Sequence, residues 1–199
     1  MHLVVGLGNP GPKYTETRHN AGFWFLDELL GGSAAGLRTV SRLQAEVLRT
    51  RWREHDLILA RPTTFMNHSG QPVRALLDYY DIPVTRLLVA YDELDLDPGV
   101  ARLKSGGGHG GHNGLRDICR HLGDPGFTRL RLGIGHPGHR DAVTGYVLGR
   151  PGRDDRCAID NAISRSIDVL PLVLDGRLQN AMTALHTSAE PAPPARGAS

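Results

Sequence analysis

Short apolar runs alternate with longer segments of helical periodicity along most of the chain. The first run, Leu3–Leu7, consists of strand-forming residues and leads into a glycine-rich turn. The next apolar segment, Phe23–Leu30, has the spacing of a helix. The same signals predict further strands at Ala45–Leu48, Leu57–Ala60, Leu87–Tyr91, Val100–Leu103 and Leu130–Ile134, and further helices at Ser69–Tyr80, Gly114–Leu122 and Asp154–Leu174.

Helices placed between strands are typical of an α/β fold. Such crossovers join parallel strands, so we expect a largely parallel sheet that is covered on both faces. The runs between Ala45 and Ala60 are close enough to pair antiparallel, which makes the predicted sheet mixed. The prediction is a single-domain, three-layer α/β/α sandwich with a twisted, mostly parallel mixed sheet over residues 1–187. Residues 188–199 are small and proline-rich, and we expect them to form a disordered tail.

Composition narrows the class of protein. The 199 residues suffice for one domain with a sizeable core, and the net charge is only +2. No apolar run approaches the roughly 18 residues that span a bilayer, and Met1–Val5 lacks the charged start of a signal peptide. Cys119 and Cys157 lie far apart, without a metal-binding or redox spacing. We therefore expect a cytoplasmic protein with reduced cysteines and no membrane contact.

The turn after the first strand, Gly6-Leu7-Gly8-Asn9-Pro10-Gly11, has the G-x-G-x-x-G spacing of dinucleotide-binding proteins. That interpretation is disfavoured because the chain continues as a loop instead of entering a helix, and no second strand ends in an acid about 20 residues later. We interpret the turn as a means of bringing Asn9 to the carboxyl end of the strand, where open α/β sheets bind ligands. A simple turn-forming role for Asn9 is the alternative.

A histidine, His19, stands at the start of the first predicted helix, within Thr17-Arg18-His19-Asn20-Ala21-Gly22. An imidazole can take a proton from water near neutral pH, so His19 is the first candidate for a general base. The chain contains ten histidines, however, and one histidine without partners proves nothing. Its neighbour Asn20 is expected to cap the helix.

Two further loops follow predicted strands and lead to the same edge of the sheet. The segment Arg61–Gly70 carries Asn67, whose amide can donate to an oxyanion and accept from a substrate N–H. Ser69 in that segment is expected to cap the next helix. Asp92 directly follows the apolar strand that ends at Tyr91, and a carboxylate there can orient a histidine.

Acids at strand ends also bind metals, which leaves a second interpretation of this region. Asp92, Asp95 and Asp97, together with His109 and His112, offer the chemistry of metal ligands. They do not form the H-E-x-x-H or H-x-E…C-x-x-C patterns, so we expect neither a metal nor a cofactor.

The segment Lys104–Gly114 is the richest in glycine, and it brings the backbone close to any ligand. It lacks the order of a P-loop, although backbone amides at the start of the next helix can still meet one phosphate. Asn113 would be a third asparagine at this edge, with helix capping as the alternative. The basic residues of this part of the chain indicate a phosphate-contacting surface or a solvated face; they are Lys104, Arg116, Arg120, Arg129 and Arg131.

Taken together, these loops resemble the bacterial-type peptidyl-tRNA hydrolase family. The resemblance rests on Gly6–Gly11 with Tyr14, on Thr17–Gly22, on Phe65–Gly70, on Tyr91–Asp95 and on Gly106–Asp117. It extends in unbroken order to about Gly149. The segment Leu178–His186 matches weakly because it carries little positive charge.

The resemblance implies hydrolysis of the ester that joins a peptide to the 3′-terminal ribose of tRNA. His19 would act as general base on a water molecule, Asp92 would orient its imidazole, and Asn9, Asn67 and Asn113 would hold the peptide backbone and the oxyanion. The implied substrate-binding residues are Tyr14, Phe65, Met66, Asn67, His112 and Asn113, and the implied tRNA phosphate contacts are Lys104, Arg131 and Arg129. The expected partner is peptidyl-tRNA, and the protein is expected to be a monomer without an obligatory protein partner.

Two rivals from other classes remain open. A non-catalytic RNA-binding relative would keep the groove without the chemistry, although the presence of His19 and Asp92 argues against it. A metal-dependent hydrolase would use Asp92, His109 and His112. The sequence contains no Gly-x-Ser-x-Gly nucleophile motif, which agrees with direct attack by water.

Overall fold

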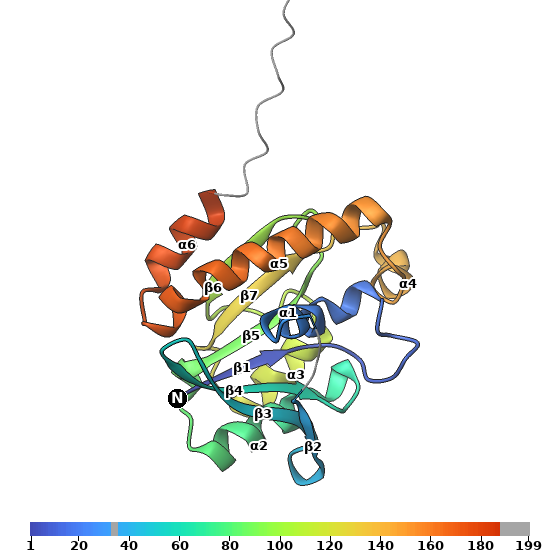
Figure 1. The fold of residues 1–199 in the computed structure, drawn as a ribbon. Coiled ribbons are helices and arrows are strands. Elements are labelled where there is room, and N and C mark those ends of the chain that lie inside the picture. Colours follow the sequence, from blue (N-terminus) through green and yellow to red (C-terminus); the bar gives the residue numbers. More distant parts are fainter. Residues whose placement is uncertain (33–35, 188–199) are drawn as a thin grey trace, which may run out of the picture.

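The fold is built on one twisted sheet of parallel and antiparallel strands (Figure 1). The computed structural model describes residues 1–32 and 36–187, and within them seven strands pair in the order β2-β3-β4-β1-β5-β7-β6. The strands are β1 (His2–Gly6), β2 (Arg38–Val40), β3 (Ala45–Trp52), β4 (His55–Pro62), β5 (Leu87–Glu93), β6 (Ala101–Ser105) and β7 (Thr128–Gly133). The four central strands are parallel, whereas β2, β3 and β6 pair antiparallel. The predicted mixed sheet is therefore confirmed.

Helices cover both faces of this sheet, which confirms the three-layer arrangement (Figure 1). On one face lie α1 (Ala21–Leu29), α5 (Arg153–Leu174) and α6 (Leu178–Thr187), and the short α4 (Val143–Val147) packs at their margin. On the other face lie α2 (Gly70–Tyr80) and α3 (Asn113–Leu122). Single-turn 3-10 helices complete the list: η1 (Arg18–Asn20), η2 (Ser41–Leu43), η3 (Met66–His68), η4 (Val84–Arg86) and η5 (Arg140–Ala142).

Alternation along the central strands divides the core into two apolar clusters. In β1, Val4 faces the cluster under α1 and α5, while Leu3 and Val5 face the cluster under α2 and α3. All three side chains have no exposed surface. Full burial of such a side chain contributes about 1.5–3 kcal/mol, so the two clusters hold the helices on the sheet.

Two glycines allow α1 to approach the sheet closely. A Cβ on Gly6 would lie 2.2 Å from the carbonyl oxygen of Gly22, and a Cβ on Gly22 would lie 2.3 Å from the carbonyl oxygen of Ala90 in β5. The amide of Leu7 also donates to Ala90 at 2.9 Å. This contact sets η1, immediately before α1, beside the end of β5. Gly6, the first glycine of the turn, thus serves packing, which agrees with the argument against a dinucleotide site.

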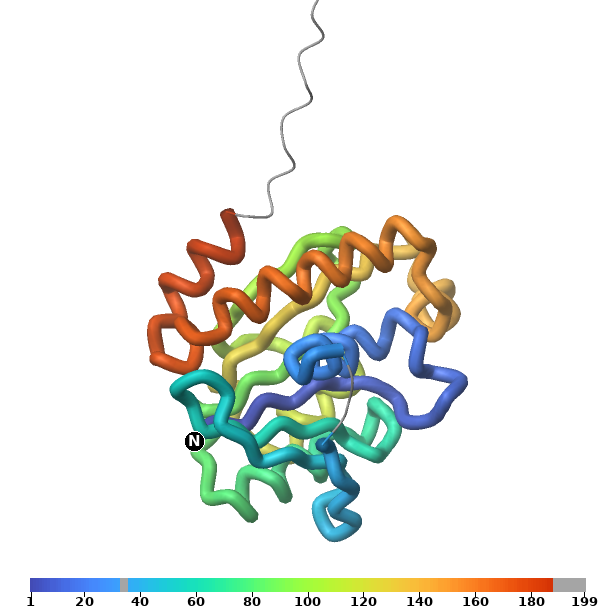
Figure 2. The backbone as a smooth tube through the Cα atoms, viewed as in Figure 1, coloured from blue at the N-terminus to red at the C-terminus, as the bar shows by residue number. Residues whose placement is uncertain are grey.

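Several elements differ from the sequence prediction. Strand β5 continues to Glu93, so Asp92 lies inside the strand and does not follow it. The antiparallel pairing of β6 with β7 and the elements β2, α4 and α6 were not predicted. The backbone trace shows α6 running beside β6 (Figure 2). There His186 Nε2 accepts a hydrogen bond from the amide of Leu103 at 3.0 Å, which closes part of the open edge of β6.

Two expectations remain, one on the C-terminal tail and one on membrane contact. The predicted tail, residues 188–199, lies outside the described residues. In the described part of the chain, no helix combines the length and the apolar character needed to cross a membrane.

Candidate active site

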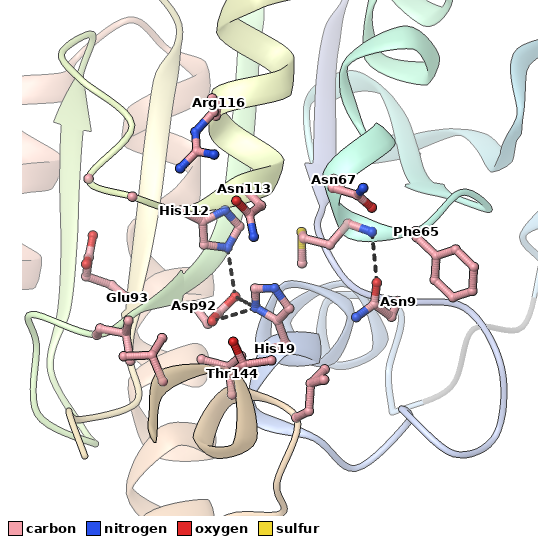
Figure 3. Close-up of a pocket in the computed structure, with 17 residues that line it drawn as sticks. Asn9, His19, Phe65, Asn67, Asp92, Glu93, His112, Asn113, Arg116 and Thr144 are labelled. Atoms are coloured by element: carbon pink, nitrogen blue, oxygen red, sulfur yellow. Dashed lines mark hydrogen bonds and ion pairs between the residues drawn. The ribbon is translucent and has the colours of Figure 1, made fainter. Parts of the chain in front are cut away.

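A cleft of about 530 Å³ opens where the parallel strands end, between η1, η3, the start of α3 and α4. Loops from both faces of the sheet meet there because the carboxyl ends of β1, β4 and β5 lie at one edge. The described residues that line it are Asn9, His19, Phe65, Met66, Asn67, Asp92, Glu93, Leu94, Gly110, Gly111, His112, Asn113, Arg116, Val143, Thr144, Val147 and Leu148. Figure 3 shows these side chains.

The centre of the cleft is a buried pair formed by His19 and Asp92. Nδ1–H of His19 lies 2.9 Å and 2.8 Å from the two carboxylate oxygens of Asp92. An ionised carboxylate only accepts hydrogen bonds, so this contact places the proton on Nδ1 and leaves the lone pair on Nε2. Nε2 lies on the far side of the ring from Asp92 and faces the cleft (Figure 3). The predicted base therefore carries its basic atom where a water molecule can reach it.

Burial and charge act in opposite directions on this pair. Burial lowers the pKa of His19, but the negative charge of Asp92 and its hydrogen bond outweigh burial and raise that pKa above 6.5. Burial would raise the pKa of Asp92, yet the charges of His19 and His112 and their hydrogen bonds hold it well below its usual range. Asp92 is 2% exposed. It therefore stays ionised and is placed to stabilise a positive charge on the His19 ring.

His112 binds the same carboxylate from the other side. Its Nε2 lies 3.0 Å from Asp92 Oδ1, and its Nδ1 accepts a hydrogen bond from the amide of Leu115 at 3.3 Å. Because a backbone amide must donate, Nδ1 is the acceptor and Nε2–H donates to Asp92. His112 is also the N-cap of α3, the role that the sequence left open for Asn113. Both histidines thus fix the Asp92 carboxylate, and α3 supplies one of them.

Asn9 is held by a small chain of amide contacts. Oδ1 of Asn20 accepts from the amide of Asn9 at 2.8 Å, and Nδ2 of Asn20 donates to the Asn9 carbonyl at 3.0 Å. Oδ1 of Asn9 in turn accepts from the amide of Met66 at 2.8 Å. The donor Nδ2 of Asn9 is then turned toward the His19 side of the cleft (Figure 3). Asn20 occupies the N-cap position of α1 as predicted, but its side chain makes no capping hydrogen bond there and holds Asn9 instead.

The other asparagines and aromatic residues lie along the mouth of the cleft. Asn67 in η3 and Asn113 at the start of α3 are exposed on opposite walls (Figure 3). Phe65 is 54% exposed and meets the ring of Tyr14 edge-on, with 6.2 Å between ring centroids. Tyr14 is not among the residues that line the cleft itself. Tyr14 therefore reaches the cleft only through its contact with Phe65.

Ser69 also departs from its predicted role. It occupies the N-cap position of α2, but its hydroxyl donates to the carbonyl of Met66 at 2.8 Å. The first amide of the helix, that of Gly70, donates instead to Asp117 Oδ2 at 2.7 Å. Because Asp117 belongs to α3, this cap ties the start of α2, which follows η3 with Asn67, to the helix that begins at Asn113.

Comparisons with known proteins agree with this arrangement. The profile of the family described as peptidyl-tRNA hydrolase matches residues 3–193. A protein of that name from Xanthomonas campestris pv. campestris is 54% identical over 187 residues, which cover 94% of this chain and 97% of that protein. One from Methylobacillus flagellatus is 52% identical over 188 residues, with the same coverage of each chain. The chain belongs to the peptidyl-tRNA hydrolase family.

A solved structure extends the agreement to three dimensions. The crystal structure of peptidyl-tRNA hydrolase from Acinetobacter baumannii superposes with a TM-score of 0.89 at 45% identity and covers 94% of each chain. The family fold therefore accounts for both helical layers and the sheet described above.

The three residues that the family resemblance assigned to tRNA phosphates differ in accessibility. Lys104 is exposed, and Arg131 is partly exposed while its Nε donates to Glu93 at 2.9 Å. Arg129 is only 1% exposed; its Nη2 donates to the carbonyl of Gly107 at 2.6 Å, and its Nη1 donates to that of Gly108. The Arg129 guanidinium is therefore buried under the glycine-rich loop that it holds, and its contact with a phosphate stays a prediction.

The structure groups a different set of candidate metal ligands from the set that the sequence suggested. Among the described residues, the one group with metal-ligand geometry is His19, Asp92 and His112, whose ligand atoms lie within 4.8 Å of one another. His109 does not belong to it, and its Nδ1 accepts from the amide of Gly111 at 3.1 Å. The nitrogens of the group that face Asp92 are both engaged with its carboxylate at hydrogen-bond distances. In this structure the three side chains form a hydrogen-bonded triad.

One wall of the cleft was missed by sequence reasoning. Val143, Thr144 and Val147 belong to α4, a five-residue helix too short for a periodic signal. Arg18, next to His19, ties this wall to η1: its Nη1 donates to the carbonyl of Arg150 at 2.8 Å, and its guanidinium stacks on Tyr146, 4.1 Å from the ring centroid. The only sequence signal for this wall was Arg18 itself, a cation directly beside the candidate base.

Proposed function

We propose that this protein hydrolyses the ester between a peptide and the 3′-terminal ribose of tRNA, with His19 as general base on a water molecule. The observation that carries the proposal is the contact of His19 Nδ1 with both oxygens of Asp92, which leaves Nε2 unprotonated at the cleft. Family membership supports the substrate class.

In the proposed reaction, water loses a proton to His19 Nε2 as its oxygen attacks the ester carbonyl carbon. The negative charge that develops on the carbonyl oxygen is stabilised by side-chain amide N–H groups. These are Nδ2 of Asn9, which is turned toward His19, and the amide of Asn113 on the opposite wall. The bond from carbon to the ribose oxygen then breaks, and the imidazolium returns its proton to that oxygen. Asp92 stabilises the imidazolium throughout and is not itself protonated.

The lining of the cleft supports water as the nucleophile. None of the described residues that line it is a serine or a cysteine, and its hydroxyl group comes from Thr144 on α4. Direct hydrolysis needs a base with one free nitrogen and a carboxylate behind it, which His19 and Asp92 supply. The same intact pair speaks against a non-catalytic RNA-binding relative.

The exposed groups define how the substrate would lie. Asn67 and Asn113 would bind the peptide backbone, Phe65 with Tyr14 and Met66 would contact its side chains, and Lys104 and Arg131 would meet tRNA phosphates. The carboxylates of the cleft are already engaged, Asp92 by two histidines and Glu93 by Arg131. A free α-ammonium group would therefore find no unpaired acid here, whereas a peptide or an N-acyl group would find amides.

The test compares N-acetyl-aminoacyl-tRNA with the unblocked aminoacyl-tRNA in a release assay, both with and without a chelator. We expect rapid release from the blocked substrate, release at least about tenfold slower from the unblocked one, and no effect of chelation. Equal release from both would contradict the proposed peptide contacts, no release from either would contradict the proposed function, and loss of activity on chelation would favour the metal-dependent alternative.

A further inference from the structure

Glu93 is a buried carboxylate in the cleft for which water activation has no use. It directly follows Asp92 in β5 and is 8% exposed. Consecutive residues of a strand point to opposite faces, and Figure 3 shows the Glu93 carboxylate directed away from Asp92. A buried charge needs partners, so the contacts of Glu93 show what it does.

Three donors from neighbouring chain segments fix the Glu93 carboxylate. Nε of Arg131 donates to Oε2 at 2.9 Å, and the hydroxyl of Tyr91 donates to the same oxygen at 3.4 Å. The amide of Asp95 donates to Oε1 at 3.2 Å. Burial and the negative charge of Glu93 raise the pKa of Tyr91, so that phenol keeps its proton and remains a donor. Glu93 is therefore a rigid acceptor and not a mobile surface acid.

Arg131 belongs to a group of four cations on neighbouring strands. In the β6–β7 register Arg102 pairs with Arg131, and Lys104 pairs with Arg129. Arg102 donates to the carbonyl of His186 at 2.9 Å, and Arg129 is turned inward to the glycine-rich loop. Cations directly opposite each other repel, and the three arginines are directed to three different acceptors, whereas Lys104 is exposed.

The contact with Glu93 determines which atoms of Arg131 remain for a ligand. Glu93 accepts from Nε, the nitrogen nearest the chain, and this leaves the two Nη groups at the tip of the side chain. The side chain of Arg131 is 24% exposed. A guanidinium held at Nε presents both Nη groups as a fork, which is the geometry that binds phosphate with two hydrogen bonds.

We propose that Glu93 is a positioning residue that directs Arg131 toward a tRNA phosphate. Asp92 orients the base His19, and the next residue of the same strand orients the phosphate-binding arginine, so β5 fixes the distance between the anchored phosphate and the scissile ester. The inference rests on the proposed function, because the phosphate contact of Arg131 is taken from it.

Charge alone predicts the opposite change in tRNA affinity on removal of Glu93. Removing a carboxylate from a surface that binds a polyanion should strengthen binding, since one repulsive charge is lost. If Glu93 positions Arg131, its removal should weaken binding because the guanidinium loses its orientation. Glu54, an exposed acid in the turn between β3 and β4, provides the matched control for loss of a negative charge alone.

The experiment measures the Kd of deacylated tRNA over a range of NaCl concentrations for wild type, Glu93→Ala, Glu93→Gln, Arg131→Ala, the double variant Glu93→Ala/Arg131→Ala and Glu54→Ala. Thermal unfolding shows which variants are folded. We expect Glu93→Ala to raise the Kd by at least about fivefold and to reduce the slope of log Kd against log salt by about one, as Arg131→Ala does. The double variant should bind no more weakly than Arg131→Ala, and Glu54→Ala should bind as wild type or more tightly.

The other outcomes separate the positioning role of Glu93 from the phosphate contact of Arg131. If Arg131→Ala weakens binding while Glu93→Ala and Glu93→Gln bind equally or more tightly than wild type, Glu93 competes with phosphate and the inference is overturned. If Arg131→Ala leaves binding unchanged, the proposed phosphate contact itself fails. If Glu93→Ala does not fold, Glu93→Gln, which keeps the shape but not the charge, decides by the same comparison, with weaker binding of at least about twofold expected.

Discussion

At the scale of single residues, hydrogen-bond partners decide which atom each side chain offers to a substrate. The sequence predicted the residue types His19, Asp92 and Asn9 at one edge of the sheet, and the structure brings them together. It could not predict that Asn20 holds the backbone of Asn9, or that Arg129 turns inward. Both arrangements depend on contacts between segments distant in sequence, which local preferences such as helix capping do not report.

The pH dependence of activity is a prediction at this scale. Only unprotonated His19 can accept a proton, and Asp92 raises its pKa, so kcat/KM should rise with pH through a midpoint above 6.5. In Asp92→Asn the attraction is lost, so the midpoint should move to lower pH while kcat falls by roughly 10²–10⁴-fold. A pH–rate profile of both proteins checks this, with the exposed Asp56→Asn as control. An unchanged midpoint in Asp92→Asn would rule out the charge of Asp92 as the cause.

At the scale of elements, the position of α1 decides whether the pair of His19 and Asp92 can form. The histidine precedes α1 and the aspartate lies in β5, so their contact requires the helix to lie against the strand. Gly6 and Gly22 permit that approach. The sequence marked Gly6 as part of a ligand-binding turn because glycine patterns for phosphate loops and for close packing look alike.

Substitution at Gly22 tests this element. In Gly22→Ala the new methyl group would lie 2.3 Å from the Ala90 carbonyl oxygen, which forces α1 away from β5. We expect a loss of about 1–3 kcal/mol in the free energy of unfolding, measured by denaturant titration, together with lower kcat. Gly145 in α4 is the matched control: a Cβ there meets nothing within 4 Å, so Gly145→Ala should be neutral or stabilising by about 0.5–1 kcal/mol. Equal stability of Gly22→Ala and wild type would show that the close approach is not required.

At the scale of the whole molecule, the sequence predicted the central strands and four of the longer helices because their apolar patterns are long and regular, but it did not predict α6, which has ten residues. It missed β2, with three residues, and α4, with five, because so few residues carry no clear period. That omission removed one wall of the cleft from the predicted site. A monomeric state and a cytoplasmic location stay predictions from sequence.

The proposed mechanism makes His19, one of ten histidines, the general base. The most direct measurement is therefore hydrolysis of N-acetyl-aminoacyl-tRNA by His19→Ala under single-turnover conditions. The matched control is His55→Ala, a histidine at the start of β4 and outside the cleft. The account predicts a rate at least ~100-fold below wild type for His19→Ala and a near-normal rate for His55→Ala. A folded His19→Ala variant that releases the acyl group at a rate close to that of wild type would contradict the account.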